Sequence, residues 1–295
     1  MGTFEQFESC CAKIKKMLTK SSSLNMYLDL VNLESEKKLK DGCILEYNTI
    51  KYALSKIKEE VEEELGLDYT PLDDYLESHA PHFEDKSMEV SRKWVLKGIN
   101  ECIEENKDSG SIIASNVLDA LVGDSCCILI VGNVEHYLKL VDKSAIMGHH
   151  FISINMDQAQ LLGKHGLNVT FILESHIFAI MPKIDKILIH IHVLLADTSF
   201  VAITGASTIC HAAKYFRKPV LITVPNHSIC GKHSEQLAFT KQLQLIQPEQ
   251  PSGIKSQFDI IQLDSIDILI TSQGIYPSTY AYQLTREFAR GFTNF

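Results

Sequence analysis

Apolar residues recur every three or four positions through the first 120 residues, which is the spacing of helices that bury one face. In residues 48–65, where Asn48 is placed to cap the helix, that face consists of Ile50, Leu54, Ile57, Val61 and Leu65. The last turns of this helix are acidic, which opposes its dipole, so we expect neighbouring helices or a cationic partner to hold it. A second helix is predicted from Ser87 to Lys107, and a third after a break at Asp108–Ser111. The pattern predicts an N-terminal helical domain over residues 1–122.

The spacing changes after Gly123, where short, nearly continuous apolar runs rich in β-branched residues begin. Such runs, typical of strands buried on both faces, occupy residues 126–131, 169–173, 186–192, 220–224 and 267–271. Helical stretches lie between and after them, at residues 157–165, 175–182, 207–216 and 278–290. Residues 144–147 fit a weaker strand, and residues 248–253 a surface connection. The alternation predicts an α/β fold over residues 123–295: a Rossmann-like, mostly parallel sheet with helices on both faces.

Charge is distributed unevenly along the chain. The 28 basic and 37 acidic residues give a net charge of −9, and residues 1–120 hold 15 of the former and 24 of the latter, leaving 13 of each for the rest. An acidic half repels phosphate backbones, so we expect no direct nucleic-acid binding; a basic protein partner, or merely a soluble surface, fits the charge.

Other features of composition concern the compartment. The longest apolar runs are far shorter than the roughly 20 residues of a membrane span, and the first residues are acidic where a secretory signal is basic. The 8 cysteines include no Cys-x-x-Cys pair. We therefore expect a cytosolic protein, not bound to a membrane, whose cysteines are reduced and mainly buried.

The predicted strand ends carry few residues suited to phosphate binding. A single glycine, Gly132, follows the first strand, and the chain contains neither Gly-x-Gly-x-x-Gly nor a P-loop, so no nucleotide or other cofactor is indicated. Thr204–Thr208 opens a helix and could offer N–H groups to an anion, although an ordinary helix start is the simpler interpretation.

The metal ligands and nucleophiles in the sequence are also sparse. His190 and His192 could join the pair His149–His150 in a zinc site, but neither pair has a carboxylate or cysteine at ligand spacing, so we expect no metal. Cys126–Cys127 begins its strand, away from the end where a site is expected, which favours core packing. The chain has no Gly-x-Ser-x-Gly elbow.

Several longer segments resemble a known family. Residues 186–198 (KILIHIHVLLADT), 204–221 (TGASTICHAAKYFRKPVL) and 268–284 (ILITSQGIYPSTYAYQL) are similar to the signature of the regulatory subunits of translation initiation factor 2B and of their relatives, the sugar-phosphate isomerases. The portion STYAYQL is most similar to the beta subunits, and Gly166–Thr170 points the same way. The resemblance runs from about Ile113 to Leu284 except in residues 242–259, and it implies a helical domain followed by a Rossmann-like domain.

The resemblance also implies what the site has lost. The aspartate and the Asn-Lys pair of the enzymes fall here on His192, Ala202 and Ile203, a nucleophilic cysteine falls on Gly132, and their Arg-Pro phosphate clamp has no counterpart in residues 147–157. Isomerisation needs groups that move a proton, so we expect a protein that is not an enzyme. The pocket of the family would be lined by Gly132, His190, His192, Ala202, Ile203 and Gly205. A ribose-phosphate type isomerase with a rearranged site is the alternative, and a stand-alone scaffold or small-molecule sensor is a third interpretation.

For partners, the resemblance implies a regulatory subunit of the guanine-nucleotide exchange factor for initiation factor 2. Such a subunit would pair with a delta-like subunit, assemble with alpha, gamma and epsilon subunits, bind the alpha subunit of initiation factor 2 and sense its phosphorylation. We assign contact with initiation factor 2 to Asn116 and Asp119, although a solvated helix face explains them equally well. Contact with the delta-like subunit is assigned to residues 192–204 and to three tyrosines that could equally complete the core of the chain itself: Tyr276, Tyr280 and Tyr282.

Overall fold

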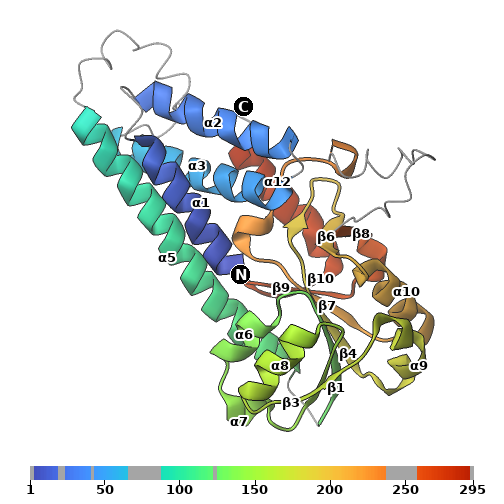
Figure 1. The fold of residues 1–295 in the computed structure, drawn as a ribbon. Helices are drawn as coiled ribbons and strands as arrows, with labels where there is room; N and C mark the ends of the chain where they lie inside the picture. Colours follow the sequence, from blue (N-terminus) through green and yellow to red (C-terminus); the bar gives the residue numbers. More distant parts are fainter. Residues whose placement is uncertain are drawn as a thin grey trace, which may run out of the picture. The chain divides into compact units, whose positions relative to one another are not determined.

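The computed structural model describes residues 3–18, 24–40, 43–65, 88–121, 125–236 and 258–292 (Figure 1). The chain forms two compact units, one of residues 1–107 and 289–295 and the other of residues 108–288. The division falls within a helix, α5 (Met88–Leu121). The predicted boundary between two domains at residue 122 stays a prediction.

Unit 1 is helical, as the three-to-four-residue spacing predicts. It contains α1 (Thr3–Met17), α2 (Leu24–Lys40), α3 (Ile44–Leu65) and the first part of α5. Each helix buries an apolar face, and the helices α3 and α5 approach closely at Gly98, where an added Cβ would lie 3.0 Å from the Cα atom of Ile57. The core is made of fully buried side chains that include Phe7, Ile14, Val31, Leu54, Ile57, Val61, Val95 and Ile99.

Two of the acids near the end of α3, Glu59 and Glu60, are paired with lysines from within unit 1. Lys97 of α5 forms an ion pair with the buried carboxylate of Glu60, while Lys56 lies 3.0 Å from Glu59 and 3.2 Å from Glu105. Both expected kinds of support, packing neighbours and cations, therefore come from the chain itself.

Two predicted helix ends in this part of the chain are wrong. The helix α3 starts at Ile44, because the N–H of Tyr47 already donates to the carbonyl of Cys43; Asn48 is therefore buried in the second turn instead of capping the helix. The predicted break at Asp108–Ser111 does not occur, since α5 continues through it. Gly110 costs a helix only about 1 kcal/mol, and burial of Ile113 and Val117 on the same helix outweighs that cost.

Unit 2 contains a seven-stranded sheet in the order β10-β9-β7-β4-β1-β2-β3, parallel except for β10 at one edge. This confirms the predicted α/β fold with a mostly parallel sheet. The strands are β1 (Cys127–Val131), β2 (His150–Ser153), β3 (Asn168–Phe171), β4 (Lys186–His190), β7 (Val220–Thr223), β9 (Ile268–Thr271) and β10 (Gly274–Pro277).

Helices cover both faces of this sheet, because alternate residues of each buried strand point to opposite sides. Leu129, Ile187 and Ile189 belong to one core cluster, and Ile128, Ile130 and Leu188 to the other. Figure 1 shows α6, α7 and α8 together on one side of the strands and α9 and α10 on the other. The helices are α6 (Glu135–Leu140), α7 (Lys143–Ile146), α8 (Met156–Lys164), α9 (Ile177–Ile180), α10 (Ala206–Phe216) and α12 (Ala281–Phe292).

Two predictions about strands are wrong or incomplete. Residues 143–146 form α7, because the carboxylate of Asp142 accepts a hydrogen bond from the Ser144 amide and caps a helical turn; the strand lies later, at β2. The predicted strand 186–192 ends at His190, and residues 193–194 enter a second sheet, β5-β6-β8 (Val193–Leu194, Phe200–Ile203, Phe258–Ile261). The predicted connection at 248–253 lies outside the described residues.

Within the described ranges, no helix combines the length and the hydrophobicity that crossing a bilayer requires.

Candidate functional site

The candidate site lies where the chain order of the sheet reverses. The strands β2 and β3 extend from one side of β1, and the chain then returns to β4 on the other side. In parallel α/β sheets the loops after two such strands part and leave a crevice at their carboxyl ends. Gly132 directly follows β1, and His190 is the last residue of β4.

Gly132 occupies a position that no other residue fits. Its φ is +76°, and a Cβ atom built there would lie 2.7 Å from the carbonyl oxygen of His190. The loop is held by Gln158 of α8, whose amide donates to the carbonyl of Gly132 and, at 2.7 Å, to the carboxylate of Glu135. The turn after β1 is therefore fixed by close packing on β4.

Imidazole rings fill the space beyond β4. His190 is buried, and its Nδ1 lies 3.0 Å from the Thr223 hydroxyl; its ring centroid lies 5.6 Å from that of Tyr137 and 6.1 Å from that of His192. Burial, followed by neighbouring histidine charges, holds the pKa of His190 well below its ordinary range. Burial also lowers the pKa of His192 to about 4 and that of His227 to about 4. These rings are neutral at pH 7.

His192 also reaches the second sheet. Its backbone N–H donates to the carbonyl of Val201 at 2.8 Å, and its ring packs against Phe258 with centroids 5.2 Å apart. Ala202 is fully buried in β6 and pairs with Asp259 of β8. The structure thus brings the sequence-predicted positions at 132, 190, 192, 202 and 203 into one continuous region.

The start of α10 is occupied by a carboxylate from the chain. Asp259 Oδ2 accepts hydrogen bonds from the backbone N–H groups of Gly205 at 2.8 Å and Ser207 at 3.1 Å. These are the donors that an anion would use at Thr204–Thr208, so the ordinary-helix interpretation fits better than an anion site. Asp259 was not predicted, because it lies at the end of the segment where the family resemblance fails.

Glu174 is a second acidic residue that the sequence analysis missed. It is exposed, and its carboxylate lies so close to Gly205 that a Cβ atom there would collide with it. Gly205 itself has a φ of +94°. The acids at this end of the sheet therefore sit beside backbone amides, and no lysine or arginine is hydrogen-bonded to Asp259 among the described residues.

The two histidine pairs do not meet. His149 Nδ1 accepts a hydrogen bond from the Cys126 amide at 3.2 Å, just before β1 starts, whereas His190 contacts Gly132, just after β1 ends. The length of β1 separates the pairs by about 16 Å. The described residues contain no group of three or more histidine, cysteine, aspartate or glutamate side chains arranged to hold a metal ion.

The residues predicted to contact partners differ in their surroundings. The side-chain amide of Asn116 donates to the carbonyl of Thr271 at 2.8 Å, which ties α5 to the end of β9, whereas Asp119 is exposed. Tyr276 and Tyr280 stack with centroids 4.0 Å apart, and their hydroxyls donate to the carbonyl and side-chain oxygens of Gln273. Tyr282 is 58% exposed.

Comparison with known proteins decides the family. The model of the initiation factor 2 subunit family matches residues 9–278. The chain belongs to this family. It is 24% identical over 215 residues to translation initiation factor eIF2B subunit beta of Dictyostelium discoideum and 25% identical over 221 residues to that of Schizosaccharomyces pombe. Each alignment covers 66% of this chain and 54% or 55% of the relative, so the chain spans about half the length of the curated relatives it matches.

Solved structures support the same fold. Crystal structures of eIF2B beta from Chaetomium thermophilum and of the tetrameric eIF2B-beta2-delta2 complex from C. thermophilum each match with a TM-score of 0.70. Their sequences are 17% and 15% identical to this chain. Each match includes 97% of this chain and, in the same order, 87% and 89% of the solved chain. A 5-methylthioribose 1-phosphate isomerase from Pyrococcus horikoshii matches with a TM-score of 0.58 and 13% identity, over 100% of this chain and 84% of that one. Subunits of eIF2B and a sugar-phosphate isomerase therefore share this fold, so the fold alone does not indicate which of the two functions a chain has; the residues of the site have to.

Proposed function

We propose that this chain is a non-catalytic, cytosolic regulatory subunit of the guanine-nucleotide exchange factor for initiation factor 2. The observation that carries the proposal is the content of the crevice after β1 and β4, where Gly132, neutral imidazoles and an internally bonded Asp259 occupy the positions that chemistry would need. Its similarity to eIF2B beta subunits supports the role of a beta-like subunit.

The crevice lacks the groups for aldose–ketose isomerisation. A cysteine cannot replace Gly132 on the present backbone, since its Cβ would lie 2.7 Å from the His190 carbonyl oxygen. Where the resemblance implies an aspartate and an Asn-Lys pair, this chain has His192, Ala202 and Ile203. Alanine and isoleucine side chains have no titratable group, so the acid–base pair of the enzymes is missing at these positions. The start of α10, where a phosphate would bind, already holds the Asp259 carboxylate.

A subunit without chemistry acts through binding. We infer that the exposed Tyr282 and the Tyr276–Tyr280 stack contact a delta-like subunit, because aromatic side chains supply large buried area in interfaces. Most of residues 192–204 are buried within the chain, so this segment can contribute chiefly through the exposed Asp197 and Thr204. The crystal structure of a beta2-delta2 tetramer supports this choice of partner. The alpha, gamma and epsilon subunits would complete the complex.

Contact with the alpha subunit of initiation factor 2 is proposed for the exposed Asp119, with Asn116 holding the helix in place. Regulation by phosphorylation requires that the phosphorylated and unphosphorylated alpha subunits make different contacts, so that one docking state is favoured over the other.

Co-expression with a delta-like subunit tests the proposal. We expect a stable complex in size-exclusion chromatography that Tyr282→Ala weakens and that Lys164→Glu, an exposed change on α8, leaves intact. Asp119→Lys should retain the delta-like subunit but lose the alpha subunit of initiation factor 2. A chain that stays alone in the presence of delta-like and alpha subunits would refute the proposal.

A further inference from the structure

Three aromatic side chains form an exposed cluster on the face of unit 2 that α9 and α10 cover. The ring of Phe178 lies 6.2 Å from that of Tyr215 and 6.0 Å from that of Phe216, and the rings of Tyr215 and Phe216 are 5.0 Å apart. Tyr215 is 75% exposed and Phe178 51% exposed. Such a cluster exposes apolar area that a partner would cover.

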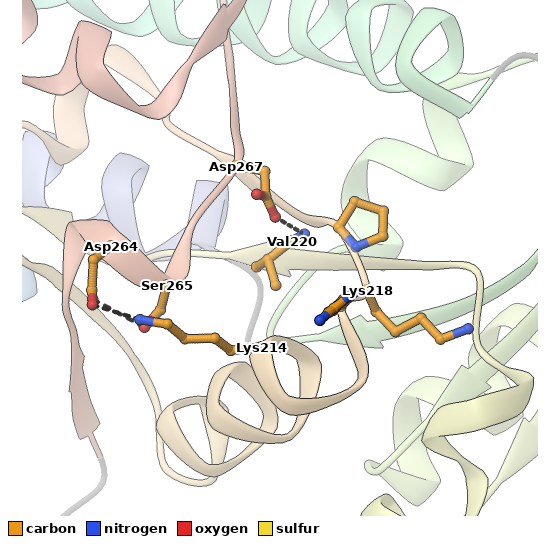
Figure 2. A pocket seen from close by; sticks show the side chains of 8 residues that line it. Lys214, Lys218, Val220, Asp264, Ser265 and Asp267 are labelled. Carbon is orange, nitrogen blue, oxygen red and sulfur yellow. Dashed lines mark hydrogen bonds and ion pairs between the residues drawn. The ribbon is translucent and has the colours of Figure 1, made fainter.

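A polar pocket of about 320 Å³ shares the last turn of α10 with this cluster. Figure 2 shows Lys214 reaching from α10 to Asp264 on the segment before β9; the pair is 2.6 Å apart. The carboxylate of Asp267 accepts the N–H of Val220 at 2.8 Å. The two carboxylates of the pocket are thus already engaged within the chain.

The charged side chain beside the pocket that has no partner within the described residues is a cation. Arg217, the residue after α10, is exposed, and among the described residues no carboxylate or carbonyl group pairs with its guanidinium. Lys218 donates to the carbonyl of Pro182 at 3.1 Å, which keeps one more cation beside the aromatic cluster. Residues 121–295 hold equal numbers of basic and acidic residues, so the exposed Arg217 beside the exposed rings gives this place a local positive charge.

The geometry disfavours a small anion as the ligand. The pocket lies at the C-terminal end of α10, where the helix dipole is negative, and Asp264 and Asp267 line it. A peptide can instead place an acidic side chain at the exposed Arg217 while an apolar side chain rests on Tyr215, away from both carboxylates. Tyrosine and arginine are also the residue types that dominate binding energy at protein interfaces.

We propose that Phe178, Lys214, Tyr215, Phe216, Arg217 and Lys218, the aromatic–basic surface, dock an acidic segment of a partner protein that carries an aromatic or aliphatic anchor. The surface includes neither the crevice after β1 and β4 nor the tyrosines assigned to the delta-like subunit. It therefore goes beyond the proposed function and can fail or succeed separately from it.

Selection of short random peptides displayed on phage, with the intact chain as the target, tests the proposal. We expect enrichment of sequences that combine Asp or Glu with Phe, Trp, Tyr or Leu. In fluorescence anisotropy, a synthesised peptide of that kind should bind at least about 10-fold more weakly to Tyr215→Ala and to Arg217→Glu. The control variants Met147→Ala, at an exposed apolar residue, and Lys164→Glu, at an exposed basic residue, should bind it like the unaltered chain.

A charge exchange sharpens the test. The same peptide with lysine in place of its acids should bind Arg217→Glu better than it binds the unaltered chain, and circular dichroism should show that all variants are folded. Selected peptides without acids, equal affinity of all variants, or self-association of the unaltered chain that Tyr215→Ala abolishes would each overturn the proposal; the last result would make a second copy the occupant.

Discussion

Replacing Asp259 by alanine removes the carboxylate that closes the start of α10. Two backbone N–H groups, of Gly205 and Ser207, would lose their acceptor, and the N-terminal dipole of an eleven-residue helix would lose its anion. Loss of a capping side chain costs about 1 kcal/mol, and loss of the charge at a partly buried helix start adds up to about 1 kcal/mol. We expect Asp259→Ala to lower the free energy of unfolding by about 2 kcal/mol in total.

Thermal denaturation followed by circular dichroism measures this loss. A destabilisation of about 2 kcal/mol corresponds to a fall in Tm of about 4–8 °C for a domain of this size. Asp264→Ala, which removes an exposed carboxylate paired with Lys214, should change Tm little. Asp259→Asn should fall between the two, because it retains an acceptor and loses only the charge.

Inorganic phosphate separates the capping role from general packing. In Asp259→Ala the two freed N–H groups can donate hydrogen bonds to a bound anion, and phosphate at ten times its Kd would restore about 1.4 kcal/mol. The unaltered chain and Asp264→Ala should show only the common effect of salt. Equal Tm values for Asp259→Ala and the unaltered chain, or an equal response of both to phosphate, would refute the assignment of this carboxylate.

Three further predictions concern the same unit. Gly132→Ala should destabilise the chain by about 2–4 kcal/mol, because the residue needs a positive φ and its new Cβ meets His190, whereas Gly163→Ala in the open face of α8 should stabilise by up to about 1 kcal/mol; urea denaturation measures both, and similar effects of the two would contradict the packing argument. Burial lowers the pKa of His192 from 6.5 to about 4, so the unfolded chain binds a proton that the folded chain excludes, and stability falls as the pH drops through that window. His192→Gln should reduce that fall by up to about 3 kcal/mol in urea titrations between pH 7 and pH 4, and an unchanged pH profile would show that the imidazole is not buried as a neutral ring. Asn116→Ala should cost about 1 kcal/mol through its lost hydrogen bond to the Thr271 carbonyl, while Ser115→Ala, on the exposed side of α5, should not; equal Tm values for the two variants would show that the contact is not formed.

The central strands could be predicted because burial on both faces leaves a plain signal. The runs at 126–131, 186–192 and 220–224 are nearly continuously apolar, and the structure places β1, β4 and β7 there within one or two residues at each end. The edge strand β10 could not be predicted in the same way, since its residues alternate between half-buried and exposed and one of them is a proline. The break expected at Gly110 failed because tertiary burial of α5 outweighs local propensity.

The location of the candidate residues in the fold could be predicted better than their contacts. The alternation of strands and helices directs attention to the carboxyl ends of the strands, and the family resemblance to Gly132 and His192; the structure places Gly132 after β1 and His192 shortly after β4. Asp259 was invisible in the sequence, because only the pairing of β8 with β6, more than fifty residues apart along the chain, brings its carboxylate to α10. The engagement of Asn116 with β9 depends on a similar long-range contact.

Turnover of a sugar phosphate tests the central claim most directly. The purified chain, alone and with a delta-like subunit, can be incubated with 5-methylthioribose 1-phosphate and followed by phosphorus NMR, with Glu174→Gln as the variant that removes the exposed carboxylate beside Gly205. We predict no conversion above the buffer control in any sample. Conversion by the unaltered chain that Glu174→Gln abolishes would contradict the account and assign the crevice to catalysis.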